Sequence, residues 1–184
     1  MAQRTDPRLV NLVGAWTLGM ADAIKDATEA AAKMTGAAPA ALVALREFLG
    51  GRTTEDLAQA VGITHSGAVR LINRLVEAGL VERRPGPDGR SGSIVLTARG
   101  RALSRKVGGS RAEAIEAALE GLDGDDGQAL LRLVEGLTAG ITLSRVRARA
   151  RRDEPAAWLC RLCDFGACGR PEGRCPAAST ARGE

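Results

Sequence analysis

The stretch from Thr53 to Thr97, TTEDLAQAVGITHSGAVRLINRLVEAGLVERRPGPDGRSGSIVLT, decides the fold of this chain. It predicts a short helix near 55–60 that is ended by Gly62, because glycine enters the left-handed conformation of a tight turn without penalty. Thr64 is then a good N-cap for a second helix over 65–78, since its hydroxyl can accept a hydrogen bond from the first helical turn. The stretch therefore begins as two short helices joined by a tight turn.

A β-hairpin is predicted to follow the two helices. Gly79 closes the second helix, and the chain becomes extended over 80–84. The segment 85–89, Pro-Gly-Pro-Asp-Gly, can only be a loop, and 93–96 returns as the second strand. Helix, turn, helix and hairpin in this order predict a winged helix-turn-helix, whose second helix is shaped to enter a DNA major groove about 12 Å wide.

The spacing of apolar residues predicts which helix faces are buried. The first helix carries Leu57, Ala58 and Val61 on its inner side. In the second helix a buried stripe is expected to consist of Val69, Ile72, Leu75 and Val76. The polar residues of this helix fall on its other faces, and they are Ser66, Arg70, Asn73, Arg74 and Glu77.

Residues within and just after this stretch resemble those of the MarR (multiple antibiotic resistance regulator) family of transcription factors. The matching pieces are Asp56-Leu57-Ala58, Val69, Asn73-Arg74-Leu75, Gly79-Leu80-Val81, Arg83, Asp88-x-Arg90 and Leu96-Thr97-x-x-Gly100. Each piece is common alone, but their order along the chain is specific. The resemblance implies a mainly α fold with a small β-hairpin wing and a helical dimerisation region. It also implies a sequence-specific DNA-binding transcriptional regulator, acting as a repressor.

Three polar side chains of the second helix share one face, because Ser66, Arg70 and Asn73 follow i, i+4, i+7 spacing. We expect Arg70 to be the main residue that reads bases or clamps a phosphate. Thr64 and Ser66 are expected to supply hydroxyl or backbone N–H contacts at the helix N-terminus. Asn73 is equally suited to bracing the helix against its neighbours. His65 lies beside these residues, and as the chain has no second histidine, a histidine-based metal or catalytic site is not expected.

The hairpin supplies a second set of expected DNA contacts. By resemblance, Arg90 corresponds to the wing arginine of the family, which reaches a minor groove. Asp88 is expected to orient Arg90 by a charge-assisted hydrogen bond. Arg83 and Arg84 are predicted to lie along the stem of the wing, near phosphates.

Long amphipathic helices are predicted near 7–34, from 98 onward and near 126–151, with a bend or weak turn at Gly108-Gly109. Their apolar faces cannot all be buried on one small winged domain, and in the MarR family such helices interlock between two subunits. We therefore expect a homodimer that presents two recognition helices to pseudo-palindromic double-stranded DNA, with half-sites about 10 base pairs apart.

This reading divides the chain into four segments. They are an N-terminal dimerisation helix (1–38), a winged helix-turn-helix (39–97), C-terminal dimerisation helices (98–152) and a cysteine-rich tail (153–184) that is expected to be disordered after Pro176.

The tail holds all the cysteines of the chain, which are Cys160, Cys163, Cys168 and Cys175. Their close spacing predicts a metal centre with four thiolate ligands. A zinc ion would be bound tetrahedrally by the four thiolates and would stabilise the folded tail. An iron–sulfur cluster is slightly favoured, because it tolerates unequal loops and often has proline after its last cysteine. The pattern is similar to the tail of SoxR-type redox regulators, although two gaps are longer here; a metal-free thiol switch stays open as a third alternative.

Composition narrows the class of protein. The formal charge of +4 and the pI of about 9.2 permit nucleic-acid binding. No apolar run approaches the roughly 20 residues of a membrane helix, and no signal-peptide segment is visible, so we expect a soluble cytoplasmic protein. The chain offers no nucleophile–base pair or phosphate-binding glycine loop, so an enzyme is not expected. Two alternatives are a MarR-type regulator that responds to a small molecule and has a purely structural zinc tail, and a redox or electron-transfer protein.

Overall fold

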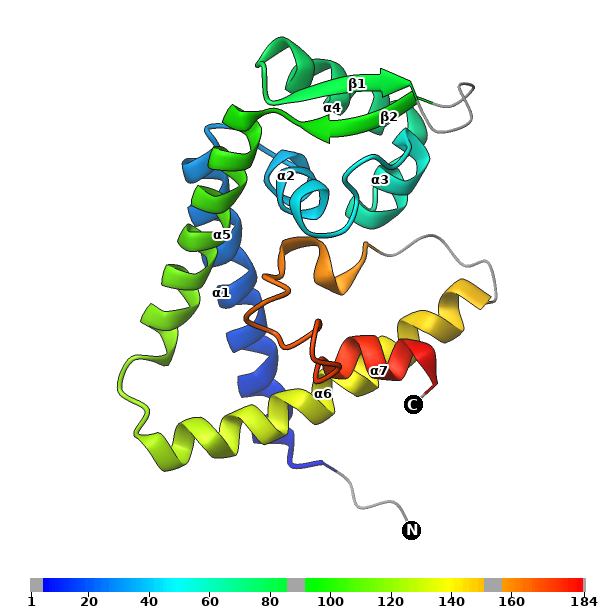
Figure 1. The fold of residues 1–184 in the computed structure, drawn as a ribbon. Coiled ribbons are helices and arrows are strands. Elements are labelled where there is room, and N and C mark those ends of the chain that lie inside the picture. Colours follow the sequence, from blue (N-terminus) through cyan, green and yellow to red (C-terminus); the bar gives the residue numbers. More distant parts are fainter. Residues whose placement is uncertain (1–4, 86–91, 151–156, 184) are drawn as a thin grey trace.

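The computed structural model describes residues 5–85, 92–150 and 157–183, and the side chains of these residues except 149–150. Figure 1 shows a winged domain above a frame of long helices, with the C-terminal tail running between them. This mainly α fold with a two-stranded hairpin confirms the predicted fold class. The elements in chain order are α1 (Pro7–Ala32), α2 (Ala38–Glu47), α3 (Thr54–Val61), α4 (His65–Glu77), β1 (Val81–Pro85), β2 (Gly92–Leu96), α5 (Ala98–Leu119), α6 (Gly124–Ala150), the 3-10 turn η1 (Leu159–Leu162) and α7 (Pro176–Arg182).

Local capping explains where the two central helices begin and end. Thr53 and Asp56 form a capping box at the start of α3, in which each side chain accepts a hydrogen bond from the backbone N–H of the other residue. Gly62 ends α3 in the left-handed conformation, with φ of 72°. The Thr64 hydroxyl then accepts a hydrogen bond from the backbone N–H of Gly67 at 3.1 Å and starts α4. The predicted turn between the helices is confirmed.

The core of the winged domain lies between α2, α3, α4 and the hairpin. Its largest fully buried side chains include Leu42 of α2, Leu57 of α3 and Ile94 of β2. The strands pair antiparallel, with Val81 opposite Leu96. Burial of these apolar groups is what holds the small helices together, since helices of this length are marginal alone.

The buried face of α4 differs from the prediction. Ala68, Leu71, Ile72 and Leu75 are buried, whereas Val69 is half-buried and Val76 is exposed. The observed set follows i, i+3, i+4, i+7 spacing, which is one straight stripe along a helix. Small Ala68 and large Leu71 both fit against the core, a choice that apolar character alone could not reveal.

The junction between the hairpin and α5 explains the Leu96-Thr97-x-x-Gly100 pattern. The Thr97 hydroxyl accepts a hydrogen bond from the backbone N–H of Gly100 at 3.0 Å and donates one to the carbonyl of Gly79 at 2.8 Å. A Cβ atom on Gly100 would lie 1.9 Å from the Leu80 carbonyl oxygen. Only glycine therefore lets the first turn of α5 lie against the chain that enters β1.

Two further predictions need correction. The helix α5 continues without a break through Gly108 and Gly109, because it packs along its length against α1 and α2, and Gly108 faces the Arg46 guanidinium. The expected disorder after Pro176 is also wrong for the described residues, since α7 forms there and packs against α6. Within the described ranges, none of the helices is long and apolar enough to cross a membrane.

Candidate nucleic-acid interface

The exposed side of α4 carries the polar residues that the sequence singled out. Thr64, His65, Ser66, Arg70 and Asn73 are all exposed to solvent. At the start of the helix the Thr64 and Ser66 hydroxyl oxygens lie 3.2 Å apart, so one donates a hydrogen bond to the other. This N-terminus also presents backbone N–H groups, which favour an anionic partner such as a phosphate.

His65 links the two helices of the helix-turn-helix. Its Nδ1 atom lies 3.0 Å from a carboxylate oxygen of Glu55 on α3, and both side chains are exposed. The hydrogen bond to His65 lowers the pKa of Glu55 from its ordinary value. Sequence reasoning treated His65 as a neighbour of the DNA-contacting residues and missed this contact, because its partner lies ten positions earlier in the chain.

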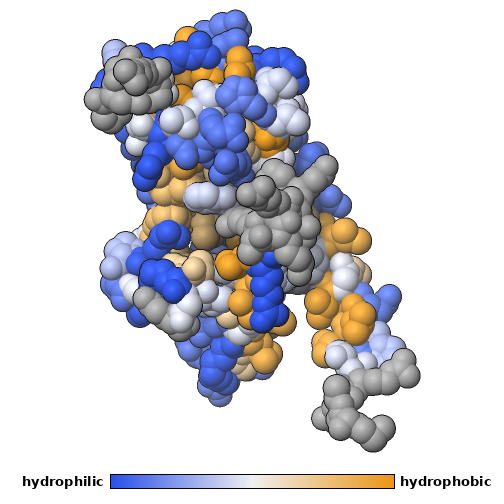
Figure 2. Space-filling model, turned by 90° about the vertical axis from the view of Figure 1, so that its right-hand side faces the viewer, coloured by the Kyte–Doolittle hydropathy of each residue, from blue (hydrophilic) through white to orange (hydrophobic). Residues whose placement is uncertain are grey.

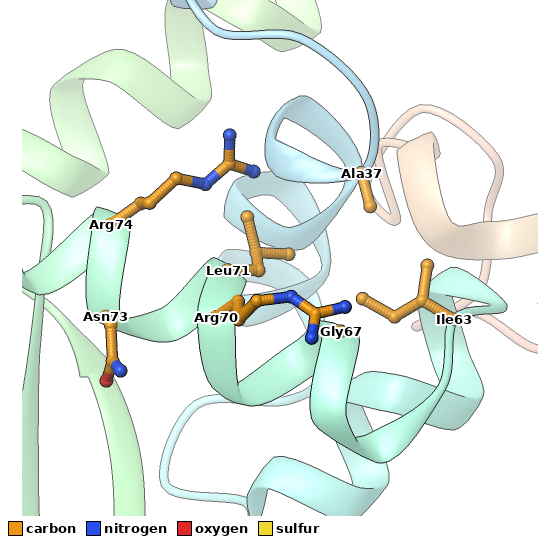
Figure 3. A pocket seen from close by; sticks show the side chains of 7 residues that line it. All are labelled: Ala37, Ile63, Gly67, Arg70, Leu71, Asn73 and Arg74. Carbon is orange, nitrogen blue, oxygen red and sulfur yellow. The ribbon is translucent and has the colours of Figure 1, made fainter.

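Arg70 lies in an open groove along α4. Figure 3 shows its guanidinium extending toward Ile63 and Gly67, while Arg74 extends on the same side from the next turn of the helix, above Leu71. The groove has a volume of about 590 Å³, and both arginines line it together with Leu71. Arg74 was not predicted as a DNA contact, although its i, i+4 spacing from Arg70 places both cations on one side of the helix.

Asn73 connects α4 to the wing. Its side-chain oxygen accepts a hydrogen bond from Arg83 of β1 at 2.7 Å, and in Figure 3 the Asn73 side chain points away from those of Arg70 and Arg74. Asn73 thus braces the wing, which was the alternative role for it. Arg84 forms an ion pair with Glu82 on the same strand. The predicted wing residues Asp88 and Arg90 lie outside the described residues.

The cysteines lie on the far side of the winged domain from α4. Cys160 lies in η1 and Cys163 directly follows it, Cys168 lies in a turn, and Cys175 is buried at the start of α7. Across the described residues, no three histidine, cysteine, aspartate or glutamate side chains are grouped so that they could hold a single metal ion. The hydrogen bond with Cys160, followed by burial, raises the pKa of the Cys163 thiol above its usual range.

An exposed polar helix, capped at its N-terminus and braced against a two-stranded hairpin, defines a winged helix-turn-helix protein. Residues 32–91 match the model of the MarR family. This match over residues 32–91 confirms the resemblance to the MarR family seen in the sequence.

Solved structures of MarR-type proteins share this fold. RV1404 from Mycobacterium tuberculosis is 24% identical, with a TM-score of 0.64 over 75% of this chain and 95% of that chain. A MarR-family transcriptional regulator from Rhodococcus sp. RHA1 is 21% identical, with a TM-score of 0.56 over 74% and 96%. CouR from Rhodococcus jostii RHA1, bound to p-coumaroyl-CoA, is 25% identical, with a TM-score of 0.52 over 70% and 88%. No curated protein matched the sequence. The chain thus shares its fold with these proteins over about three quarters of its length.

Proposed function

We propose that this protein is a sequence-specific DNA-binding transcriptional regulator that acts as a homodimer. The observation that carries the proposal is the outer side of α4, where Arg70 and Arg74 line an open groove beside a helix N-terminus. Arginine suits both phosphates and guanine, because its planar guanidinium donates two parallel hydrogen bonds. A helix of this kind, fixed to a rigid domain through a buried opposite face, is what reading a major groove requires.

Exposed apolar side chains on α1 and α6 support the homodimer. Leu18 on α1 is 71% exposed, and Leu133 and Leu137 on α6 are 65% and 61% exposed. Figure 2 shows such side chains along the protruding N-terminal part of α1. A continuous apolar face of this kind marks a protein–protein contact. A second copy of the chain covers it most simply, and a two-fold axis then sets two α4 helices against one side of the DNA.

Within this dimer the residues have distinct roles. Arg70 and Arg74 contact bases or phosphates in the major groove, and Thr64, His65 and Ser66 lie where the helix enters it. Asn73 sets the position of the wing through Arg83, whose remaining guanidinium N–H groups face the DNA backbone with Arg84. The family resemblance assigns a minor-groove contact to Arg90 and its support to Asp88.

The test is selection of binding sites from a random duplex library with the full-length protein, followed by titration of the selected duplex at several salt concentrations. Arg70→Ala should weaken binding by about 1–3 kcal/mol and relax the preference at one base position if Arg70 reads a base. Arg105→Ala on the exposed side of α5 is the matched control, because it removes the same charge far from α4. Failure of the protein to retain any duplex at low ionic strength would overturn the proposal.

A cavity between α1 and the winged domain suggests a small-molecule effector. It has a volume of about 540 Å³ and is lined by residues of α1, α2, α3, α5 and η1, with charged groups from Lys25, Glu29, Arg111 and Arg161. Glu29 pairs with Lys25 at 3.7 Å, so the two arginines are what favour an anionic ligand with an apolar part, and CouR is a neighbour that binds an acyl-CoA. Arg111→Ala should weaken binding of such a ligand, as measured by calorimetry with p-coumaroyl-CoA as the first probe.

A further inference from the structure

A further cavity, called the tail pocket below, lies where the C-terminal tail folds back on α6. It has a volume of about 330 Å³ and is lined by residues of α6, η1 and α7 and of the segments beside η1. Among the described residues, only Leu159 lines both the tail pocket and the cavity between α1 and the winged domain. The two cavities are therefore separate sites. A volume at the lower end of the range of small-molecule sites suits a compact ligand.

Short side chains on α7 leave the tail pocket open. This helix packs against α6 (Figure 1), and the residues with which it lines the pocket include Ala177, Ala178 and Ala181. Because an alanine side chain ends at Cβ, α7 can lie close to α6 without filling the space between them. Val146 and Leu159 add larger apolar groups from the other walls. The walls of the tail pocket therefore suit the apolar part of a ligand.

The charged groups of the tail pocket are all cations. Arg145 of α6, Arg170 of the turn before α7 and Arg182 of α7 line it, and no aspartate or glutamate does so among the described residues. Guanidinium groups from three segments of the chain therefore face one small space. Arginine binds carboxylates and phosphates well, because its planar fork donates parallel hydrogen bonds to two oxygens.

Two of these arginines are held in place by groups that carry no negative charge. Arg145 is half-buried and donates a hydrogen bond to the backbone carbonyl of Ala157. The Arg170 guanidinium carbon lies 4.4 Å from the centroid of the Phe165 ring, and its Nη1 atom lies 3.9 Å from the Cys160 sulfur. A carbonyl and an aromatic ring orient a guanidinium without cancelling its full charge. Each guanidinium has five N–H donors, so donors remain for a ligand.

The tail pocket is joined to the winged domain through Trp158, which lines it. Phe48, at the end of α2, stacks on Trp158 with ring centroids 5.4 Å apart and on Phe165 with centroids 5.3 Å apart. The backbone N–H of Trp158 donates to the Ala60 carbonyl of α3 at 2.9 Å, and that of Phe165 donates to the Glu47 carboxylate of α2 at 3.0 Å. A ligand in the tail pocket therefore touches a side chain that is fixed to α2 and α3.

We propose that the tail pocket binds a small organic anion with a compact apolar body. Its carboxylate or phosphate monoester group accepts hydrogen bonds from Arg145 and Arg170, and its apolar body lies against Leu159 and the alanines of α7. The bound anion links α6 to the tail and so holds the tail against the winged domain. This site requires no DNA, so it can be tested separately from the proposed regulator function.

The first experiment is calorimetry on the full-length protein with three probes that share one ring. Cyclohexanecarboxylate and cyclohexyl phosphate carry the two head groups, and cyclohexanecarboxamide is the neutral control. At least one anion should bind once per chain, and the amide should bind about tenfold more weakly or worse, because it makes no charge-assisted hydrogen bond. The tighter anion identifies the head group. An amide that binds as tightly as the anions, or no binding of either anion at millimolar concentration, overturns the proposal.

Variants then locate the bound anion. Arg145→Gln and Arg170→Gln should each weaken its binding by about tenfold or more, because a hydrogen bond to a charged group is lost. Arg174→Gln is the matched control, since it removes the same charge from an exposed position in the same tail that does not line the pocket. Ala181→Leu should weaken binding with every charge intact, because the larger side chain narrows the pocket. Far-ultraviolet circular dichroism checks that each variant keeps its helices.

A different pattern among the variants overturns the assignment. If Arg145→Gln and Arg170→Gln bind the anion as wild type does, the tail pocket is not its site. Loss of binding in Arg111→Gln alone would place the anion in the cavity between α1 and the winged domain instead.

The second experiment uses Trp158 as a reporter. The chain has two tryptophans, so Trp16→Phe leaves Trp158 as the only one. Saturation with the anion that binds more tightly should change the emission of Trp158, with the same dissociation constant as in calorimetry. The same concentration of cyclohexanecarboxamide should leave the emission unchanged. Emission that does not respond to an anion bound by calorimetry would show that the anion does not lie beside Trp158, and would overturn the proposed site.

Discussion

The apolar side chains of the winged domain are buried, whereas many of those on the long helices are exposed to solvent. In the winged domain the large residues of α2, α3 and α4 are closed off by each other and by the hairpin. On α1 and α6, leucines and valines at the same helical spacing remain on the surface. The winged domain therefore closes its core within one chain, whereas α1 and α6 leave an apolar face open, which a second chain covers in the proposed homodimer. The free energy of unfolding of the winged domain should depend on its own core, whereas the stability of the contact made by α1 and α6 should depend on protein concentration.

The largest expected effect lies inside the winged domain. Leu71→Ala should lower the free energy of unfolding by about 2–5 kcal/mol, because it leaves a cavity in a core where Leu71 is 2% exposed. Val76→Ala on the same helix is the matched control, since Val76 is 40% exposed, and should change it by less than about 0.5 kcal/mol. Urea denaturation measures both. Equal effects would contradict the observed face of α4.

The second prediction concerns the joint between the two regions. Gly100→Ala should lower the free energy of unfolding by about 1–3 kcal/mol, because the added methyl group meets the Leu80 carbonyl and forces the start of α5 away from the hairpin. Gly109→Ala in the same helix has open space around it and should be neutral or stabilising. Thermal unfolding of the two variants side by side gives the answer, and a destabilised Gly109→Ala would weaken the comparison.

The third prediction tests the open faces. Leu137→Asp should weaken the homodimer at least tenfold, or about 1.4 kcal/mol, because an unpaired carboxylate would be buried in the interface. Analytical ultracentrifugation over a range of concentrations measures this dissociation. Near-ultraviolet dichroism of the monomer should still report a folded winged domain. A variant that stays dimeric would show that α6 faces something other than a second copy.

The smallest effect is expected at the surface of the winged domain. The pKa of Glu55 is lowered by its hydrogen bond to His65, so the carboxylate form is favoured in the folded state. This contribution is present above the unfolded pKa of a glutamate, about 4.3, and is lost as the pH falls through the folded value. Glu55→Gln should therefore be slightly less stable than wild type near pH 6, and the gap should close in acid. A difference in stability between wild type and Glu55→Gln that grows below pH 4 would contradict this prediction.

Much of the winged domain was predictable from sequence because its signals are local. The Thr64 cap and the Gly62 turn each depend on residues within one helical turn, and the structure confirms both. The choice of buried stripe on α4 was not predictable in the same way. Val76 and Leu71 are both apolar, and only the positions of α2 and the hairpin determine which of them is covered.

In the candidate site, too, some features were predictable from the sequence and others depended on tertiary contacts. Exposure of Ser66 and Arg70 followed from the helical repeat, but the Asn73–Arg83 and His65–Glu55 contacts join residues ten positions apart on different elements. The continuity of α5 through Gly108 likewise depends on packing against neighbouring helices, which offsets the low helix propensity of glycine.

The sequence by itself determined the order of the elements, their caps and the presence of four thiols in one short segment, because these depend on neighbours along the chain. Only the tertiary structure decided that the tail packs against α2 and α3, that Cys160 and Cys168 pack against buried Cys175, and that α1 and α6 keep an uncovered apolar face. Each of these depends on contacts between residues that are distant in sequence, and their free energy is set by which surfaces meet when the chain is folded.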